Sequence, residues 1–413
     1  MFKLHFIPLL AIMVSNACAQ ITSSAMLTYT PLLLAENGGT AMHTGLVAAT
    51  YALGFMFGCL RSLPLIGRVG YIRAFAAAAG TSALIIMVLT GVSSPWLWAI
   101  LRFIMGMALA MLFTTADAWL SISAPDHMRG RILSVNSIAV GVMAIASQLM
   151  VANMSQTPDR AFEVLIAILL FAVVILCMTH SMPPRIDTDS KMSPLKVWRA
   201  SPIAVLGAFV SGAVTSSLLT IIPFTFSQAG ASPSLTAGLI ACLYTGRLLF
   251  QWPIGSLSDK WDRRWLIAAC AGSIALISIT TILLDPFQSF ESQPLQFTGF
   301  LFAIGTLLIV VGGLCFPLYS LCVGHAFERK VCSGVSISTS LLLMWAVGSV
   351  AGPLLISFTS ILMEKHSSSY VIGGLCLVLT LFTLWRLHQQ PPAATVIALP
   401  YMMYPSAGLG ISK

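Results

Sequence analysis

The segment Gly255-Ser256-Leu257-Ser258-Asp259-Lys260-Trp261-Asp262-Arg263-Arg264 places five charged side chains in its last six positions. An apolar run precedes it and another follows it, and each run is long enough to cross a bilayer. Only 8% of the 413 residues are charged, so this concentration of charge is unusual. A tight charged loop between two apolar runs predicts a turn that joins two membrane-spanning helices at the membrane surface.

The composition of the whole chain excludes a soluble globular protein. Hydrophobic residues make up 57% of it, and its mean hydropathy is +0.92. A soluble protein carries roughly 25% charged residues, and a spanning helix takes about 20 residues. We therefore predict an all-α integral membrane protein with about twelve transmembrane helices. Their expected positions are residues 7–34, 42–65, 71–92, 96–121, 131–153, 161–181, 202–228, 234–256, 264–284, 296–325, 333–362 and 368–387.

The net charge of +8 comes from basic residues that stand singly or in pairs at the ends of the apolar runs. This placement carries topology information and is not a phosphate-binding patch, so no nucleic-acid partner is expected. With an even number of helices, both termini lie on one side of the membrane. Placing them in the cytoplasm leaves only Arg160 and Lys365 facing outside, which is the bias that the positive-inside rule requires.

The first apolar run could be taken for a cleaved signal peptide, and the cysteines for metal ligands, but the sequence favours neither interpretation. Lys3, the apolar residues after it and Ala17-Cys18-Ala19 resemble a secretory or lipoprotein signal, but the run continues to Leu34. We expect an uncleaved first helix. The nine cysteines are scattered through apolar segments without metal-type spacing, so they are interpreted as small core residues. No cofactor and no metal is expected.

One long polar connection, residues 182–201, divides the chain six helices from six. It predicts a first unit at 1–181, a cytoplasmic linker at 182–201, a second unit at 202–388 and a tail at 389–413. Lys196, Trp198 and Arg199 in the linker favour a short amphipathic helix on the membrane surface. Residues 49–83 and 241–275 can also be aligned as a faint repeat, which pairs Gly54 with Gly246. Chance similarity between two apolar helices is the alternative.

Several motifs together resemble those of the major facilitator superfamily of secondary transporters, in its YcaD-type branch. The motifs are Gly255-x-x-x-Asp259-Lys260-x-x-Arg263-Arg264, Arg102-x-x-x-Gly106 and Gly348-Ser-Val-Ala-Gly352-Pro353. The resemblance covers residues 7 to 388. It implies two six-helix bundles around a central cavity, a bacterial inner-membrane location and solute transport. Phe327-Glu328 stands where members of the branch have an Asn-Asp pair.

In the superfamily, the Asp of the charged loop latches the two halves together on the cytoplasmic side. The resemblance therefore assigns gating roles to Asp259, Lys260, Arg263 and Arg264. The first-half loop keeps Arg68 and Arg73 but has Gly67 where the Asp is expected. Its latch must be weaker, or Asp117 must supply the carboxylate by reaching Arg68, Arg73 or Arg131.

Ionisable groups inside a membrane are costly, so they tend to face a wet cavity or a partner. Arg102, Arg247 and Asp117 are the ionisable residues expected within helices, Asp117 at the inner end of the fourth one. No acidic residue is expected at midplane depth to pair with the two arginines, which favours an anionic or carboxylate-bearing solute. For Arg102 the alternative is a packing contact with backbone carbonyls or Gln side chains, and for Arg247 it is snorkelling or pairing with carbonyls.

Asn16, Gln20 and Ser23 stand at spacings of four and three, so they share one face of the first helix, and Ser24 and Thr28 extend this polar stripe. The remaining candidates for solute binding are polar residues on such faces and aromatic residues that could form walls: Asn16, Gln20, Thr215, Tyr244, Tyr319 and Trp345. Interhelical bonding or core packing is the alternative for each.

Coupling to protons has no obvious carrier, since no Asp or Glu is expected at the midplane. His325 is a candidate because histidine is the residue type that most often carries protons in proteins, although a tether to the charged loop is its simpler role. Either His325 or Asp117 takes part in coupling, with H⁺ as the second partner, or transport is uniport or anion exchange.

Three functions are compatible with such a chain. The first is a monomeric transporter of a small anionic or zwitterionic solute, working by rocker-switch alternating access. The second is a non-transporting sensor or assembly protein on the same scaffold, which would normally carry an extra soluble domain. The third, a membrane enzyme, needs an acid–base cluster, a nucleophile or metal-ligand spacing at membrane depth, and the sequence shows none of them. We predict the transporter and no enzymatic activity.

Overall fold

The computed structural model describes residues 2–92, 94–123, 129–154, 157–178, 194–284, 297–329, 334–363 and 366–389. These residues form thirteen helices and no strand, and twelve of the helices are long and apolar enough to cross a membrane. The exception is the short α7. The helices are α1 (Phe2–Glu36), α2 (Ala41–Val69), α3 (Tyr71–Leu89), α4 (Pro95–Ser123), α5 (Arg129–Asn153), α6 (Pro158–Cys177), α7 (Pro194–Ala200), α8 (Pro202–Gln228), α9 (Pro233–Ser258), α10 (Arg263–Leu284), α11 (Phe297–Glu328), α12 (Gly334–Leu362) and α13 (Ser367–Gln389).

The predicted helices are all present, with errors at some ends. The second helix does not end at residue 65. It continues through Pro64 to Val69 and is capped by Gly70, whose φ of 85° lies in the left-handed region that favours glycine. The predicted run 161–181 is shifted, because α6 begins at Pro158 and ends at Cys177. The structure confirms an all-α fold with twelve membrane-length helices.

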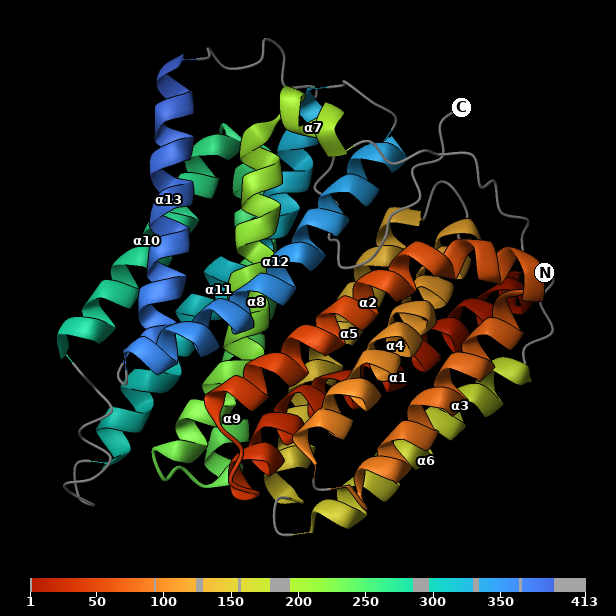
Figure 1. Cartoon of the computed structure of the whole chain (residues 1–413). Coiled ribbons are helices and arrows are strands. Elements are labelled where there is room, and N and C mark those ends of the chain that lie inside the picture. Colours follow the sequence, from red (N-terminus) through yellow and green to blue (C-terminus); the bar gives the residue numbers. More distant parts are fainter. Residues whose placement is uncertain are drawn as a thin grey trace.

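Two separate apolar cores show how the helices are grouped. One is drawn almost entirely from α1 to α6, and the other from α7 to α13. Figure 1 shows these groups side by side, the first in red to yellow and the second in green to blue. Between the groups, the main contacts are α2 with α12, α5 with α9, and α1 with α8. The predicted linker helix is present as α7, while residues 182–193 and the tail from 390 on lie outside the described residues.

Close glycine contacts show that the two groups are built as a repeat. In each group, two glycines let a pair of helices approach so closely that an added Cβ would overlap a backbone carbonyl oxygen of the facing helix. The pairs are Gly54 with Phe103 and Gly106 with Tyr51 between α2 and α4, and Gly246 with Ile309 and Gly312 with Leu243 between α9 and α11. The contact residues of α9 lie 192 positions after their counterparts in α2, and those of α11 lie 206 positions after their counterparts in α4. The faint repeat in the sequence is therefore a repeat in the packing.

The two groups touch at the end of the molecule where α2 begins and α12 ends, which we call the far end. There the Ser357 hydroxyl donates a hydrogen bond of 2.8 Å to the Ala41 carbonyl oxygen. Gly45 lies so close to α12 that a Cβ would overlap the Ser357 side chain. The opposite end, which carries α7 in Figure 1, is called the α7 end.

Candidate functional site

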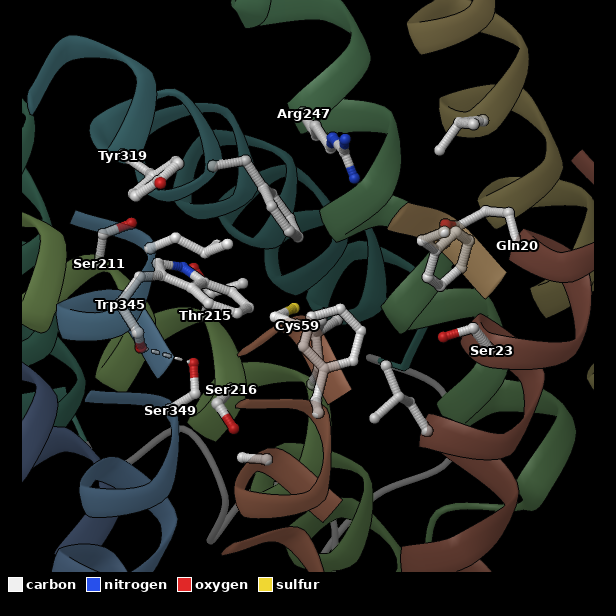
Figure 2. Close-up of a pocket in the computed structure, with 18 of the residues that line it drawn as sticks. Gln20, Ser23, Cys59, Ser211, Thr215, Ser216, Arg247, Tyr319, Trp345 and Ser349 are labelled. Carbon is white, nitrogen blue, oxygen red and sulfur yellow. Dashed lines mark hydrogen bonds between the residues drawn. The ribbon is translucent and has the colours of Figure 1, made fainter. Parts of the chain in front are cut away.

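A cavity of about 260 Å³ lies between the two groups of helices. Its walls come from α1, α2, α4 and α5 on one side and from α8, α9, α11 and α12 on the other. Figure 2 shows polar and aromatic side chains from both groups around one space. Seven of the eight predicted substrate-binding residues line it: Asn16, Gln20, Thr215, Tyr244, Arg247, Tyr319 and Trp345.

Arg247 is held on an aromatic shelf in the cavity wall. Its guanidinium carbon lies 5.3 Å from the centroid of the Phe316 ring, within cation–π range. Tyr244, one turn earlier on α9, stacks on the same ring with centroids 5.9 Å apart. In Figure 2, Arg247 points from α9 toward the middle of the cavity. The shelf therefore presents a cationic fork to whatever occupies the space.

The second group also supplies an apolar and weakly polar wall. The Tyr319 and Trp345 rings meet edge to face, with centroids 6.3 Å apart. The Ser349 hydroxyl donates a 3.0 Å hydrogen bond to the Trp345 carbonyl oxygen, one turn before it (Figure 2). The Thr215 hydroxyl lies 3.3 Å from the Cys315 sulfur. Aromatic faces with a few hydroxyls suit an organic solute better than a bare ion.

The polar stripe predicted on α1 divides between two roles. Asn16, Gln20 and Ser23 line the cavity, as their spacing of four and three predicts. Farther along the helix, the Thr28 hydroxyl donates a 2.8 Å hydrogen bond to the Gln148 side chain, whose amide donates to the Ser24 carbonyl oxygen at 3.2 Å. In that part of the stripe the polar side chains therefore join α1 to α5 by hydrogen bonds, which is the alternative to solute binding.

Asp117 lies in the cavity wall, whereas the sequence placed it at the inner end of the fourth helix, within reach of Arg68, Arg73 or Arg131. The Asn16 amide donates to an Asp117 carboxylate oxygen at 3.3 Å and lies 3.4 Å from the Asn136 side-chain oxygen. Asp117 thus brings an acidic group to the cavity that also contains Arg247. Its predicted partners Arg68 and Arg73 are exposed, and the side chain of Arg131 lies outside the described residues.

Arg102 is the predicted substrate-binding residue that the structure places elsewhere. Its side chain is only 2% exposed and does not line the cavity. Its guanidinium carbon lies 4.4 Å from the Tyr51 ring centroid, and one of its nitrogens lies 3.3 Å from the Met105 sulfur. Tyr51, the ring that Arg102 packs against, itself lines the cavity.

Several wall residues were missed by sequence reasoning, namely Tyr51, Phe55, Cys59, Asn136 and Gln251. Asn136 and Gln251 had a signal, because each is an amide side chain inside an apolar helix. The repeat contained a second signal. Phe55 and Cys59 lie 192 positions before Arg247 and Gln251, so the alignment of 49–83 with 241–275 already paired them.

The charged loop after α9 joins the end of α11 in one partly buried ionic cluster. The Arg263 side chain lies 3.6 Å from Asp259 and 3.5 Å from Glu328, and His325 lies 3.6 Å from the other oxygen of Glu328. Arg263 is only 6% exposed, whereas Lys260 faces out. Glu328, the departure from the pattern of the branch, supplies a carboxylate to this cluster. His325 is therefore tethered to the loop region and does not line the cavity.

Arg264 makes a second ion pair within the loop. Its side chain binds both oxygens of Asp262, at 2.7 and 3.1 Å among other contacts, and its backbone N–H donates to the same carboxylate at 3.0 Å. Partial burial raises the pKa of Asp262, but the side-chain and backbone hydrogen bonds from Arg264 and its charge lower it further, so the pKa lies below its ordinary value. This pair closes the loop and fixes the start of α10.

The sequence profile of the Major Facilitator Superfamily matches residues 12–224 and 204–399, which together span most of the chain. The chain belongs to the Major Facilitator Superfamily. Among its relatives is the uncharacterized MFS-type transporter YcaD of Escherichia coli strain K12. The two are 28% identical over 382 residues, which cover 89% of this chain and 93% of YcaD. The resemblance to the YcaD-type branch is confirmed.

Solved structures of this superfamily share the fold. The nucleoside transporter NupG superposes with a TM-score of 0.74 at 12% identity, over 92% of this chain and 98% of that one. A D-xylose-proton symporter superposes with a TM-score of 0.66 at 15% identity, over 92% and 97% of the two chains. At such identities the likeness shows the fold alone. The chain is thus a multi-pass membrane protein of a transporter family, with two six-helix bundles around a central cavity.

Proposed function

We propose that this protein carries a small anionic or zwitterionic solute across the membrane by alternating access. The observation that supports this best is the position of Arg247, on an aromatic shelf in a cavity that both groups of helices enclose. A guanidinium binds carboxylate or phosphate oxygens with two parallel hydrogen bonds, and it does so more strongly where water is excluded.

The size and lining of the cavity limit the solute. A volume of about 260 Å³ is at the small end of ligand pockets, so it suits a single small metabolite. Tyr244, Tyr319 and Trp345 would contact the organic part of the solute, while Asn16, Gln20 and Thr215 would bind its polar groups. Asp117, on the opposite group from Arg247, adds a place for an ammonium group, which favours a zwitterion within this class.

Alternating access requires that one end closes while the other opens. The far end is closed here by the contact between α2 and α12, including the hydrogen bond from Ser357 to Ala41. We propose that the two halves rock about the cavity and that Asp259, Arg263 and Arg264 control the α7 end. Because most basic residues lie at that end, we place it and both termini in the cytoplasm.

We further propose that any proton coupling uses Asp117 and not His325. Asp117 lines the cavity beside Asn16, so its protonation state can respond to the bound solute. His325 is 3% exposed and lies against Glu328 in the loop cluster. The D-xylose-proton symporter, a neighbour in fold, is proton-coupled by its name. In proteoliposomes, an imposed pH gradient should drive uptake by the native protein, and Asp117→Asn should abolish that response.

The proposed solute class is tested by binding to the purified protein. A thermal-shift screen against small carboxylates, amino acids and organic phosphates should identify a stabilising compound. Arg247→Gln should weaken its binding at least 30-fold, and Arg247→Lys should weaken it less, because the charge remains. Arg61→Gln, an exposed arginine on α2, serves as the matched control. Sugars and simple amines, which have no carboxylate or phosphate group, complete the screen. Unchanged affinity in Arg247→Gln, or stabilisation only by compounds without a carboxylate or phosphate group, would refute the proposal.

A further inference from the structure

We propose that Arg102 forms a second anion site, beyond the central cavity toward the far end, that captures the solute when the two halves separate there. The inference rests on the proposed function, since it gives the same class of solute a first binding station. The site would bind an oxyanion, either a carboxylate or a phosphate group.

Arg102 is a buried cation whose partners are not acidic. Its guanidinium lies over the Tyr51 ring at 4.4 Å and beside the Met105 sulfur, and its Nε has no hydrogen-bond partner among the described residues. Within the same residues, no carboxylate forms an ion pair with it. Burying a guanidinium in this way is costly, so it needs a compensating reason.

The repeat shows that packing is not that reason. Arg102 and Leu308 occupy equivalent positions, 206 apart, on α4 and α11, and Tyr51 and Leu243 are equivalent, 192 apart, on α2 and α9. The second half therefore makes the same close helix contact with two buried leucines. Because two leucines satisfy the fold there, the Arg–Tyr pair is an addition specific to the first half, as expected of a functional residue.

Beside Arg102 lies a void of about 10 Å³, lined by residues of α1 and α2 and by Thr220 of α8. At this volume it holds no more than about one water molecule. Leu27 and Thr220 line both this void and the central cavity. A single layer of side chains, formed by Leu27, Thr220 and Tyr51, therefore separates Arg102 from the space that contains Arg247.

The void lies between helices of the two halves, on the side of the far end. Thr44, Val47 and Ala48, which line it, lie within three positions of Gly45, on the part of α2 that contacts α12. Separation of α2 from α12 would widen the void and expose Arg102 to the outside. An anion bound there has only to pass the layer of Leu27, Thr220 and Tyr51 to reach Arg247.

The test measures how fast each arginine reacts with p-hydroxyphenylglyoxal, by peptide mass mapping of the full-length protein in nanodiscs. Gly45→Trp should prevent closure of the far end, because even a Cβ at this position overlaps Ser357. Gly80→Trp is the matched control, since a Cβ there meets nothing within 4 Å. If Gly45→Trp does not fold, Gly45→Leu provides a smaller side chain that also obstructs closure. Prolonged reaction of the native protein detects Arg102 when the far end opens spontaneously. Acetate, lactate, succinate, glutamate and phosphate are the probes, at constant ionic strength.

We expect Arg102 to react at least ten-fold faster in Gly45→Trp than in the native protein or Gly80→Trp, and at least one probe to slow that reaction. Equal reaction of Arg102 in all three proteins, or its failure to react in either Gly45 variant and on prolonged reaction of the native protein, would overturn the proposal. Reaction without protection by any probe would also overturn it, since Arg102 would then be exposed but bind no anion. Protection of Arg247 in the native protein reports separately on the central site, so failure of one site is distinguishable from failure of the other.

Discussion

The two halves of this transporter close their equivalent helix junctions with different chemistry. In the first half, Tyr71 and Trp119 pack ring against ring with centroids 5.7 Å apart, and both are fully buried. In the second half, the corresponding positions hold Arg263 and His325, which meet Asp259 and Glu328.

The equivalence follows from the repeat. Tyr71 and Arg263 are 192 positions apart, like Gly54 and Gly246, and Trp119 and His325 are 206 apart, like Gly106 and Gly312. The glycine contacts are the same in both halves, while the residues at the loop end differ. The comparison teaches that backbone packing is conserved between the halves, whereas the junction at the α7 end is apolar in one and ionic in the other.

The largest expected effect is at the aromatic junction. Trp119→Ala should lower the free energy of unfolding by about 4 kcal/mol, because it leaves a cavity beside Tyr71 in a buried position. Trp119→Phe is the control and should cost much less, since the ring contact is partly retained. Denaturant unfolding in detergent measures both. A loss below about 1 kcal/mol in Trp119→Ala would show that the rings do not hold this junction.

The ionic junction should be somewhat weaker. Arg263→Met should cost about 3 kcal/mol, because two carboxylates at the edge of the membrane lose their partner. The same variant should slow uptake, as should Asp259→Asn, if the cluster controls the α7 end. Arg61→Gln, an exposed arginine, is the control for lost charge alone. If Arg263→Met were as stable as the native protein, the cluster would contribute no more to stability than ordinary surface ion pairs do.

A smaller effect is expected from replacing Gly324, which packs against the Arg263 side chain. A Cβ on Gly324 would lie 2.8 Å from the guanidinium carbon of Arg263, so Gly324→Ala must displace that side chain from its carboxylates. Because the displaced group is the end of a flexible side chain, we expect a loss of only about 1 kcal/mol. Gly374→Ala, where a Cβ meets nothing within 4 Å, should cause no loss. Equal midpoints of thermal unfolding in the two variants would contradict the described contact.

The smallest effect concerns pH and exists in one half only. Asp262 has a pKa below its ordinary 3.8, so its pair with Arg264 stabilises the folded protein above that value, and the contribution is lost as the pH falls through the folded pKa. Asp262→Asn should therefore lower the thermal midpoint at pH 6, and the difference from the native protein should shrink below about pH 4. Gly70 is the equivalent position in the first half, and glycine has no carboxylate, so this position adds no pH dependence to the stability of that half. A constant difference from pH 6 to pH 3 would contradict this account.

Particular residues show how far sequence reasoning reached. Asn16, Gln20 and Ser23 were predicted to share a face of the first helix, and all three line the cavity, because helical periodicity alone sets that relation. Tyr51, Asn136 and Gln251 were missed, because the rotation of each helix about its axis is set by its neighbours. Asp117 was expected at the inner end of its helix, within reach of the loop arginines, yet it contacts Asn16 across the first bundle. The depth of a residue along one helix did not tell which other helix it would meet.

By itself, the sequence determined the membrane class, the twelve helices, the charged loop and the superfamily, because lipid solvent demands long apolar helices and leaves charges only where topology or function requires them. Only the tertiary structure decided that Arg247 lies over Phe316 in the cavity while Arg102 lies behind Tyr51, outside it. It also decided that Glu328 completes the cluster around Arg263. Those relations join residues far apart in the chain, and they depend on how helices rotate and approach one another, which their glycine contacts allow and their own sequences do not state.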